Sequence, residues 1–163
     1  MLNTIQNKIV NLSEASLRVD RWRQEGGLIV WTNGVFDLIH PGHIRYLCAA
    51  KALGQYLVVG INSDASVKRL KGPDRPINTE EHRLLQMAAM QMADLVVLFE
   101  EDTPLECILK VRPDIIAKGG DYQEEEVVGG KEAKAWGGAV KLLPFETGHS
   151  SSKIIESIKR ANQ

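Results

Sequence analysis

The chain has little cysteine and no excess of charge of either sign, and each absence removes a class of protein. Only Cys48 and Cys107 occur in 163 residues, far apart and inside apolar helical patterns. A disulfide framework or a cysteine-based zinc site is therefore not expected, and we predict two buried, reduced thiols. The 20 Lys and Arg nearly balance the 21 Asp and Glu, for a formal net charge of -1. Nucleic acid is not an expected partner for such a surface.

Long apolar runs are also missing. Residues 1–8 (MLNTIQNK) lack the basic start and apolar block of a signal peptide, and no run approaches membrane-spanning length. We therefore expect a cytoplasmic protein with no membrane partner.

The pattern of apolar residues predicts the α/β class. A chain of 163 residues that is 44% hydrophobic can bury one core but not two, so we expect a single domain over residues 1–163. Within it, residues 1–27 form an N-terminal helical extension with an amphipathic helix over 13–25, and 63–78 form a long polar loop. Strand-length apolar runs alternate with helical patterns after residue 28, which indicates a Rossmann-like parallel sheet with helices on both faces. About five strands are expected, over residues 28–32, 56–61, 95–99, 115–118 and 140–143.

A histidine motif follows the first of these strands. Residues 31–43 read WTNGVFDLIHPGH, which leaves a strand, turns at a glycine and enters a helix with Pro41 in its first turn. His40 and His43 lie three residues apart, so both imidazoles can share one face beside free backbone N–H groups, and Gly42 leaves room for a phosphate. Two imidazoles there could stabilise the charge that builds up as a phosphoryl bond breaks.

Other uses of the two histidines remain open. Either one alone could cap the helix or lie in the core. A metal site is a weaker alternative because His-x-x-His supplies two ligands and neither His82 nor His149 has a spacing that nominates a third. A dinucleotide redox site is weaker still, because the glycine fingerprint is absent.

Further candidates lie in polar segments after the later strands. Lys71 could reach a triphosphate and Arg75 offers a planar donor fork, or both could be ordinary solvated loop residues. Asn62 and Asp64 could face a sugar phosphate or shape a turn. After the strand over 115–118, Lys118, Gly119 and Asp121 could approach a base and ribose, or form an empty tight turn. Ser150 and Ser151 could bind phosphates at a helix start, or only cap it.

Taken together, these segments resemble the HxGH nucleotidyltransferase (cytidylyltransferase-like) family, from about residue 28 to the end of the chain. The resemblance rests on residues 32–37, 40–43, 62–66, 68–72, 75–76, 99–104 and 118–122. Within the family the chain looks most like the D-glycero-β-D-manno-heptose 1-phosphate adenylyltransferases, which make ADP-heptose for lipopolysaccharide or capsule. It looks like their stand-alone form, because it is too short for a fused sugar kinase domain.

The resemblance implies a reaction in which a sugar phosphate attacks the α-phosphorus of ATP, with Mg²⁺, and pyrophosphate leaves. It implies catalytic roles for His40, His43 and Lys71. It further implies nucleotide contacts by Asn33, Gly34, Phe36, Gly42, Arg83, Lys118, Gly119, Asp121, Ser150 and Ser151, and sugar-phosphate contacts by Asp37, Asn62, Asp64 and Arg75. Arg83 could instead pair with Glu80 on its helix, and the role of His149 is doubtful because relatives often carry isoleucine or cysteine there.

Two other functions and one partner stay open at this stage. A glycerol-3-phosphate cytidylyltransferase shares the first motif, and a non-catalytic nucleotide-binding module would share the fold. Relatives are commonly homodimers, so Trp22, Met87, Met90 and Met92 would line a dimer contact or pack in the core, and core packing is the simpler use.

Overall fold

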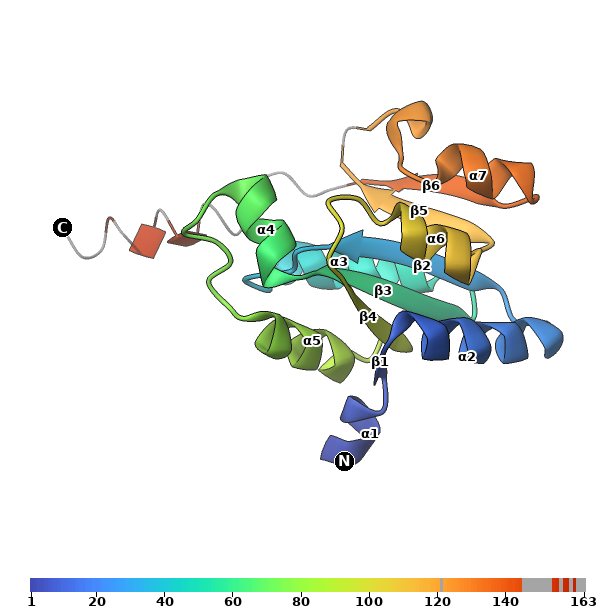
Figure 1. Cartoon of the computed structure of the whole chain (residues 1–163), viewed down its shortest axis with the longest axis horizontal. Coiled ribbons are helices and arrows are strands. Elements are labelled where there is room, and N and C mark those ends of the chain that lie inside the picture. The colour runs from blue at the N-terminus through green and yellow to red at the C-terminus, as the bar shows by residue number, and fades with distance from the viewer. Residues whose placement is uncertain (121, 145–153, 156, 159, 161–163) are drawn as a thin grey trace.

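The computed structural model describes residues 1–120, 122–144, 154–155, 157–158 and 160, and Figure 1 shows a sheet flanked by helices. Its strands are β1 (Ile9–Val10), β2 (Ile29–Gly34), β3 (Tyr56–Asn62), β4 (Leu95–Phe99), β5 (Ile115–Gly119) and β6 (Ala139–Leu143). They are ordered β1-β4-β3-β2-β5-β6, and each neighbouring pair is parallel. The predicted α/β class is confirmed, with six strands in the described residues instead of about five.

The additional strand is β1, which pairs with the edge of β4 through Ile9 and Val10. It lies inside residues 1–27, which were predicted to be a purely helical extension. A strand of two residues is too short for its side-chain alternation to stand out in a sequence.

Helices cover both faces of the sheet. One face packs against α2 (Leu12–Gln24), α6 (Leu105–Val111) and α7 (Gly130–Ala135). The other packs against α3 (Pro41–Lys51) and α5 (Glu80–Ala89), with α1 (Leu2–Gln6) beside α5. The remaining elements are α4 (Asp64–Lys71) and the 3₁₀ turn η1 (Glu124–Glu126).

Burial on both faces explains why the strands are apolar without alternation. In β2, Ile29 and Trp31 belong to one core cluster and Val30 belongs to the other, and all three side chains are completely buried. In a parallel sheet covered on both sides, each successive residue enters one core or the other.

The segment over 63–78 differs from its prediction, because its first half is the helix α4. The Ser63 side chain accepts a hydrogen bond from the Ser66 N–H, and Asp64 lies in the first turn while Lys68, Arg69 and Lys71 lie in the last. Capping and charges placed to suit the helix dipole stabilise this short helix. The polar composition alone had indicated a loop.

One of the two cysteines is buried, and three of the methionines lie in the core or pack against it. Cys107 is buried as predicted, whereas Cys48 is exposed, because α3 turns Leu47 and Ala50 toward the core and leaves Cys48 on its outer side. Both cysteines are free. Met87 is a core residue, and Met90, Met92 and Trp22 pack against the core, as the simpler of their two predicted uses required.

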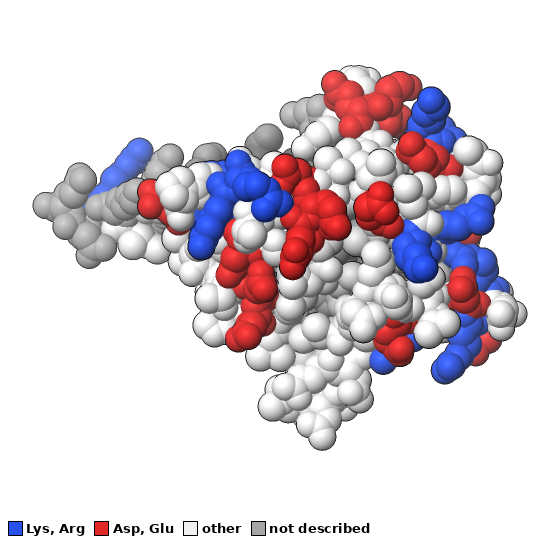
Figure 2. Space-filling view, viewed as in Figure 1, with Lys and Arg blue, Asp and Glu red and all other residues white. Residues whose placement is uncertain are grey.

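Charge is mixed over the face shown in Figure 2, where acidic and basic groups interrupt each other. No helix in the described residues is long and apolar enough to cross a membrane.

Candidate active site

The site lies where the order of the sheet reverses. The chain runs outward from β2 to β3 and β4 on one side and then returns to β5 on the other side of β2. The carboxyl ends of strands flanking such a point open a crevice in α/β sheets. A cavity of about 290 Å³ is found there, lined by Asn33, Gly34, Val35, Phe36, Asp37, His43, Tyr46, Lys71, Arg75, Lys118, Gly119 and Tyr122.

The two motif histidines stack on each other at the start of α3. His40 is the N-cap residue, with Pro41 at the first helical position, as the motif predicted. The ring centroids of His40 and His43 are 3.7 Å apart with an interplanar angle of 24°. His40 is only 5% exposed, while His43 lines the cavity. Of the pair, His43 is therefore the imidazole that a ligand would meet first.

The environment of His43 also includes the ring of Phe36. The Phe36 ring stands edge-on to it, with centroids 5.3 Å apart and an interplanar angle of 61°. Burial, followed by the neighbouring His40 and Lys71 side chains, lowers the pKa of His43 to about 4. Among the described residues, no hydrogen-bond partner serves the buried His43 Nδ1. His43 is thus a neutral imidazole near pH 7, with a buried Nδ1 that has no hydrogen-bond partner among these residues.

This low pKa predicts how stability depends on pH without ligand. The folded-state pKa of about 4 lies below the reference value of 6.5, so the unfolded chain binds the proton first. The contribution of a neutral His43 is complete above pH 6.5 and is lost as the pH falls toward 4, by roughly 1 to 2 kcal/mol because solvent screens a partly exposed ring. In urea titrations, H43Q should lose less stability than the wild type over this interval. Parallel curves for the two proteins would contradict the prediction.

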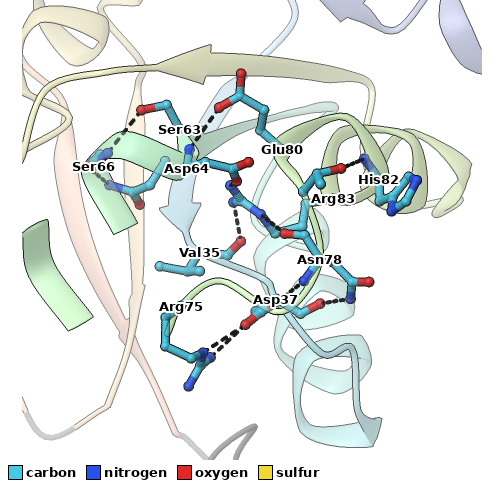
Figure 3. A network of polar contacts seen from close by, with 12 residues as sticks. Val35, Asp37, Ser63, Asp64, Ser66, Arg75, Asn78, Glu80, His82 and Arg83 are labelled. Carbon is cyan, nitrogen blue, oxygen red and sulfur yellow. Dashed lines mark hydrogen bonds and ion pairs between the residues drawn. The ribbon is translucent and has the colours of Figure 1, made fainter. Parts of the chain in front are cut away.

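Asp37, in the middle of the histidine motif, joins it to a loop that is distant in the sequence. Its carboxylate accepts hydrogen bonds from the backbone N–H groups of Ile77 and Asn78 at 2.8–3.0 Å and from Arg75 Nε at 3.0 Å. Figure 3 shows Arg75 and Asn78 converging on it. Burial alone would raise the pKa of Asp37, but the N–H groups of Asn78 and Ile77 and the Arg75 guanidinium together lower it below its usual value. Asp37 is therefore ionised, and its carboxylate holds the Arg75 side chain at the cavity wall.

Lys71, the last residue of α4, lines both this cavity and a second one of about 400 Å³. The pKa of Lys71 is lowered by burial and by Arg75, against the opposing effect of Asp37. The second cavity also reaches Asn62, Leu70, Asp102, Thr103, Pro104 and Val128. Lys71 is thus a cation between two adjoining spaces.

Lys118 is the other cation common to the two cavities, and it comes from the end of β5. Burial lowers its pKa, and its Nζ lies 5.2 Å from the centre of the Tyr122 ring. Together with Lys71 and Arg75, Lys118 gives the crevice a positive lining that suits phosphate oxygens.

Tyr46 was missed from the sequence. Its hydroxyl donates a hydrogen bond to the Ala117 carbonyl at 3.0 Å and lies 2.6 Å from Thr32 Oγ1, which ties β2 to β5 at the floor of the cavity. Burial raises its pKa to about 12. Its position three residues after His43, on the same helix face, was the signal that could have nominated it. Val35 and Tyr122, also in the cavity wall, carried no such signal.

Several predicted residues lie elsewhere. Asn62 lines the second cavity, and Gly42 is buried in α3. Asp64 and Arg83 form an ion pair at 2.8 Å and do not line the first cavity. Asp121, Ser150 and Ser151 lie outside the described residues, as does His149.

The acidic and imidazole side chains do not gather into a metal centre of their own. Within the described ranges, no group of three or more His, Cys, Asp or Glu side chains could hold a metal ion.

The chain is similar in sequence to proteins of one family. The model of a family described as cytidylyltransferase-like matches residues 31–157. The bifunctional protein HldE of Magnetococcus marinus is 51% identical over 152 residues, and that of Methylobacillus flagellatus is 50% identical over 152 residues. Each alignment covers 93% of this chain but 31% of the relative, so the chain spans about a third of their length.

A solved structure supports the same relationship. The chain is similar to the lipopolysaccharide core biosynthesis protein of Thermoplasma volcanium, with 33% sequence identity and a TM-score of 0.61. The match covers 74% of this chain and 98% of the solved one. Shared sequence and shared fold thus extend over almost the whole of that protein.

Proposed function

Because this chain belongs to the cytidylyltransferase-like family and is a nucleotidyltransferase, we propose that it joins ATP to D-glycero-β-D-manno-heptose 1-phosphate, giving ADP-heptose and pyrophosphate. The observation that carries the proposal is the crevice between β2 and β5, where His43, Lys71, Arg75 and Lys118 meet. Three cations and a neutral imidazole suit a reaction between two anionic phosphates.

Two observations favour a sugar phosphate as the acceptor. Residues 62–66 and 118–122 resemble the heptose enzymes, and they contribute Asn62, Lys118 and Tyr122 to the second cavity. Among the similar proteins, one is described as acting in lipopolysaccharide core biosynthesis. We therefore place this activity in the supply of heptose for lipopolysaccharide or capsule.

The proposed reaction needs no covalent intermediate on the protein. A phosphate oxygen of the sugar attacks the α-phosphorus of ATP, the bond from that phosphorus to the bridging oxygen of the β-phosphate breaks, and pyrophosphate leaves. The neutral His43 ring donates its N–H to an α-phosphate oxygen, and Lys71 offsets charge on the phosphates. Both groups act by orienting the reactants and by stabilising charge that grows in the transition state.

Measuring pyrophosphate release with ATP and with CTP, each with heptose 1-phosphate, tests the proposal. We expect ATP to be preferred by at least roughly tenfold in kcat/KM, because a base pocket discriminates through its hydrogen bonds, and mass spectrometry should detect ADP-heptose. A preference for CTP would overturn the choice of base.

The description of the matching family as cytidylyltransferase-like favours CTP in one second candidate, and glycerol 3-phosphate is the acceptor that the sequence resemblance left open for it. Glycerol 3-phosphate with CTP is therefore the matched substrate pair for the same assay. Binding of ATP without turnover on any sugar phosphate would indicate a nucleotide-binding module instead.

A further inference from the structure

Arg83 is a charged side chain with no exposed surface. Its Nε donates to the Asn78 carbonyl at 3.1 Å, its Nη1 to the Val35 carbonyl at 2.8 Å, and its Nη2 to Asp64 Oδ1 at 2.8 Å. Figure 3 shows the guanidinium between these three segments. Burying a charge is costly, and a buried ion pair is weak evidence of stabilisation by itself. The role of Arg83 therefore depends on the three segments that these contacts hold in place.

The contact with Val35 acts on the turn that carries Phe36. The Val35 carbonyl and the Phe36 N–H belong to one planar peptide group, so fixing the carbonyl fixes the plane from which Phe36 continues. Phe36 has φ of +47°, a left-handed conformation that costs a bulky residue energy. Such a conformation persists when surrounding contacts determine it, and the Arg83 hydrogen bond is one of these.

Phe36 in turn sets the position of His43. The His43 ring contacts Phe36 edge-on and stacks on His40. A change in the Phe36 backbone would move the Phe36 ring, which is one of the two rings that His43 contacts. The path from Arg83 to His43 thus consists of one hydrogen bond, one peptide plane and one ring contact.

The other two contacts of Arg83 connect it indirectly to two of the three cations of the site, Arg75 and Lys71. Asn78 is bound to Asp37, which also holds Arg75. Asp64 begins α4, and Lys71 ends it. Arg83 therefore connects the histidine turn, the Arg75 loop and the helix that presents Lys71.

We propose that Arg83 is a positioning residue, which holds the Val35–Phe36 turn so that the His43 imidazole keeps its orientation in the crevice. The proposal deepens the transfer reaction proposed above and rests on it. A direct phosphate contact by Arg83, as the sequence resemblance implied, does not follow from this placement. All three of its nitrogens donate to protein oxygens, and it does not line the cavity.

Substitution of Arg83 tests the proposal through His43 itself. The variant R83M removes the three donors, and R83K keeps the charge but has a single nitrogen to share among them. The matched control is R23M, because Arg23 also donates to two carbonyls, of Val111 and Arg112, and to one carboxylate, of Asp20. Arg23 lies on α2, away from the crevice.

Two measurements are made on each variant, after circular dichroism has shown that it folds. The first is the pKa of His43, followed by the NMR resonance that H43Q lacks, which needs no turnover. The second is the steady-state rate with ATP and heptose 1-phosphate. In R83M we expect the pKa of His43 to rise from about 4 toward 6.5, and kcat to fall by roughly 10- to 100-fold with little change in the KM for ATP. R83K should be intermediate, and R23M should match the wild type in both.

The outcomes separate this proposal from its alternatives. An unchanged His43 titration in folded R83M would overturn the positioning role. A large rise in the KM for ATP with kcat preserved would indicate a phosphate contact and would also overturn it. If R83M does not fold, the same titration of R83K decides. A shifted His43 pKa in a protein whose wild type shows no turnover would keep the positioning role while removing the proposed reaction.

Discussion

His43→Ala should lower kcat by roughly 10² to 10³, the scale for losing one donor to the transition state. His43 is the motif imidazole that lines the cavity, and it is neutral in the ligand-free site because its pKa is about 4. The neutral ring keeps one N–H, which can donate a hydrogen bond to a phosphate oxygen. Pyrophosphate release with saturating ATP and sugar phosphate measures the effect.

His82→Ala is the matched control, because His82 is an exposed histidine on α5 outside both cavities. It should keep turnover close to that of the wild type. H43A should also keep the fold, because His43 is partly exposed in the first turn of α3. Near-normal pyrophosphate release from folded H43A would remove this side chain from the mechanism.

The parts of this molecule that depend on neighbouring residues could be predicted from the sequence. Apolar runs of strand length predicted β2, β3 and β4, and the spacing of His40 and His43 predicted their common helix start. Both follow from the local periods of strands and helices. The helix α4 also had local signals, in the Ser63 cap and the charges at its two ends, but its polar composition hid them.

The parts that depend on distant contacts could not be predicted in this way. Asp37 was predicted to contact the sugar phosphate, and the fold adds hydrogen bonds to its carboxylate from backbone N–H groups some 40 residues further along the chain. Arg83 was predicted to contact nucleotide phosphates or to pair with Glu80, and in the fold it donates hydrogen bonds to oxygens of Val35, Asn78 and Asp64. A charged residue near a phosphate motif has the same sequence signal whether it contacts the ligand or supports the loop. Only the folded chain separates these two uses.

The three cations of the crevice differ in how the fold accommodates their charge. Arg75 is already paired with Asp37 at 2.8 Å, whereas Lys71 and Lys118 have pKa values lowered by burial. A paired guanidinium adds little net charge but offers directed donors, while the two ammonium groups gain stability when phosphates enter. The site is thus arranged to bind anions more strongly than its charge count suggests.

Asp37→Ala should lower the free energy of unfolding by about 3 to 5 kcal/mol, the range for removing one partner of a buried ion pair. The Asp37 side chain is 1% exposed and that of Arg75 is 14% exposed, so neither the guanidinium nor the N–H groups of Ile77 and Asn78 regain full hydration. Urea denaturation near pH 7 measures the loss.

A matched control for this variant is Asp102→Ala, since Asp102 pairs with Arg69 at a similar distance, 2.7 Å, but with side chains 55% and 50% exposed. It should cost about 1 kcal/mol or less. The pKa of Asp37 lies below its reference value of 3.8, so its contribution is complete above pH 3.8 and is lost as the pH falls through the folded-state pKa. The difference in free energy of unfolding between the wild type and D37A should therefore narrow only in strong acid. Protonation of the wild-type carboxyl then removes the same ion pair. Equal losses of unfolding free energy in D37A and D102A at pH 7 would contradict the prediction, because the buried Asp37 pair would then stabilise the fold no more than the exposed Asp102 pair.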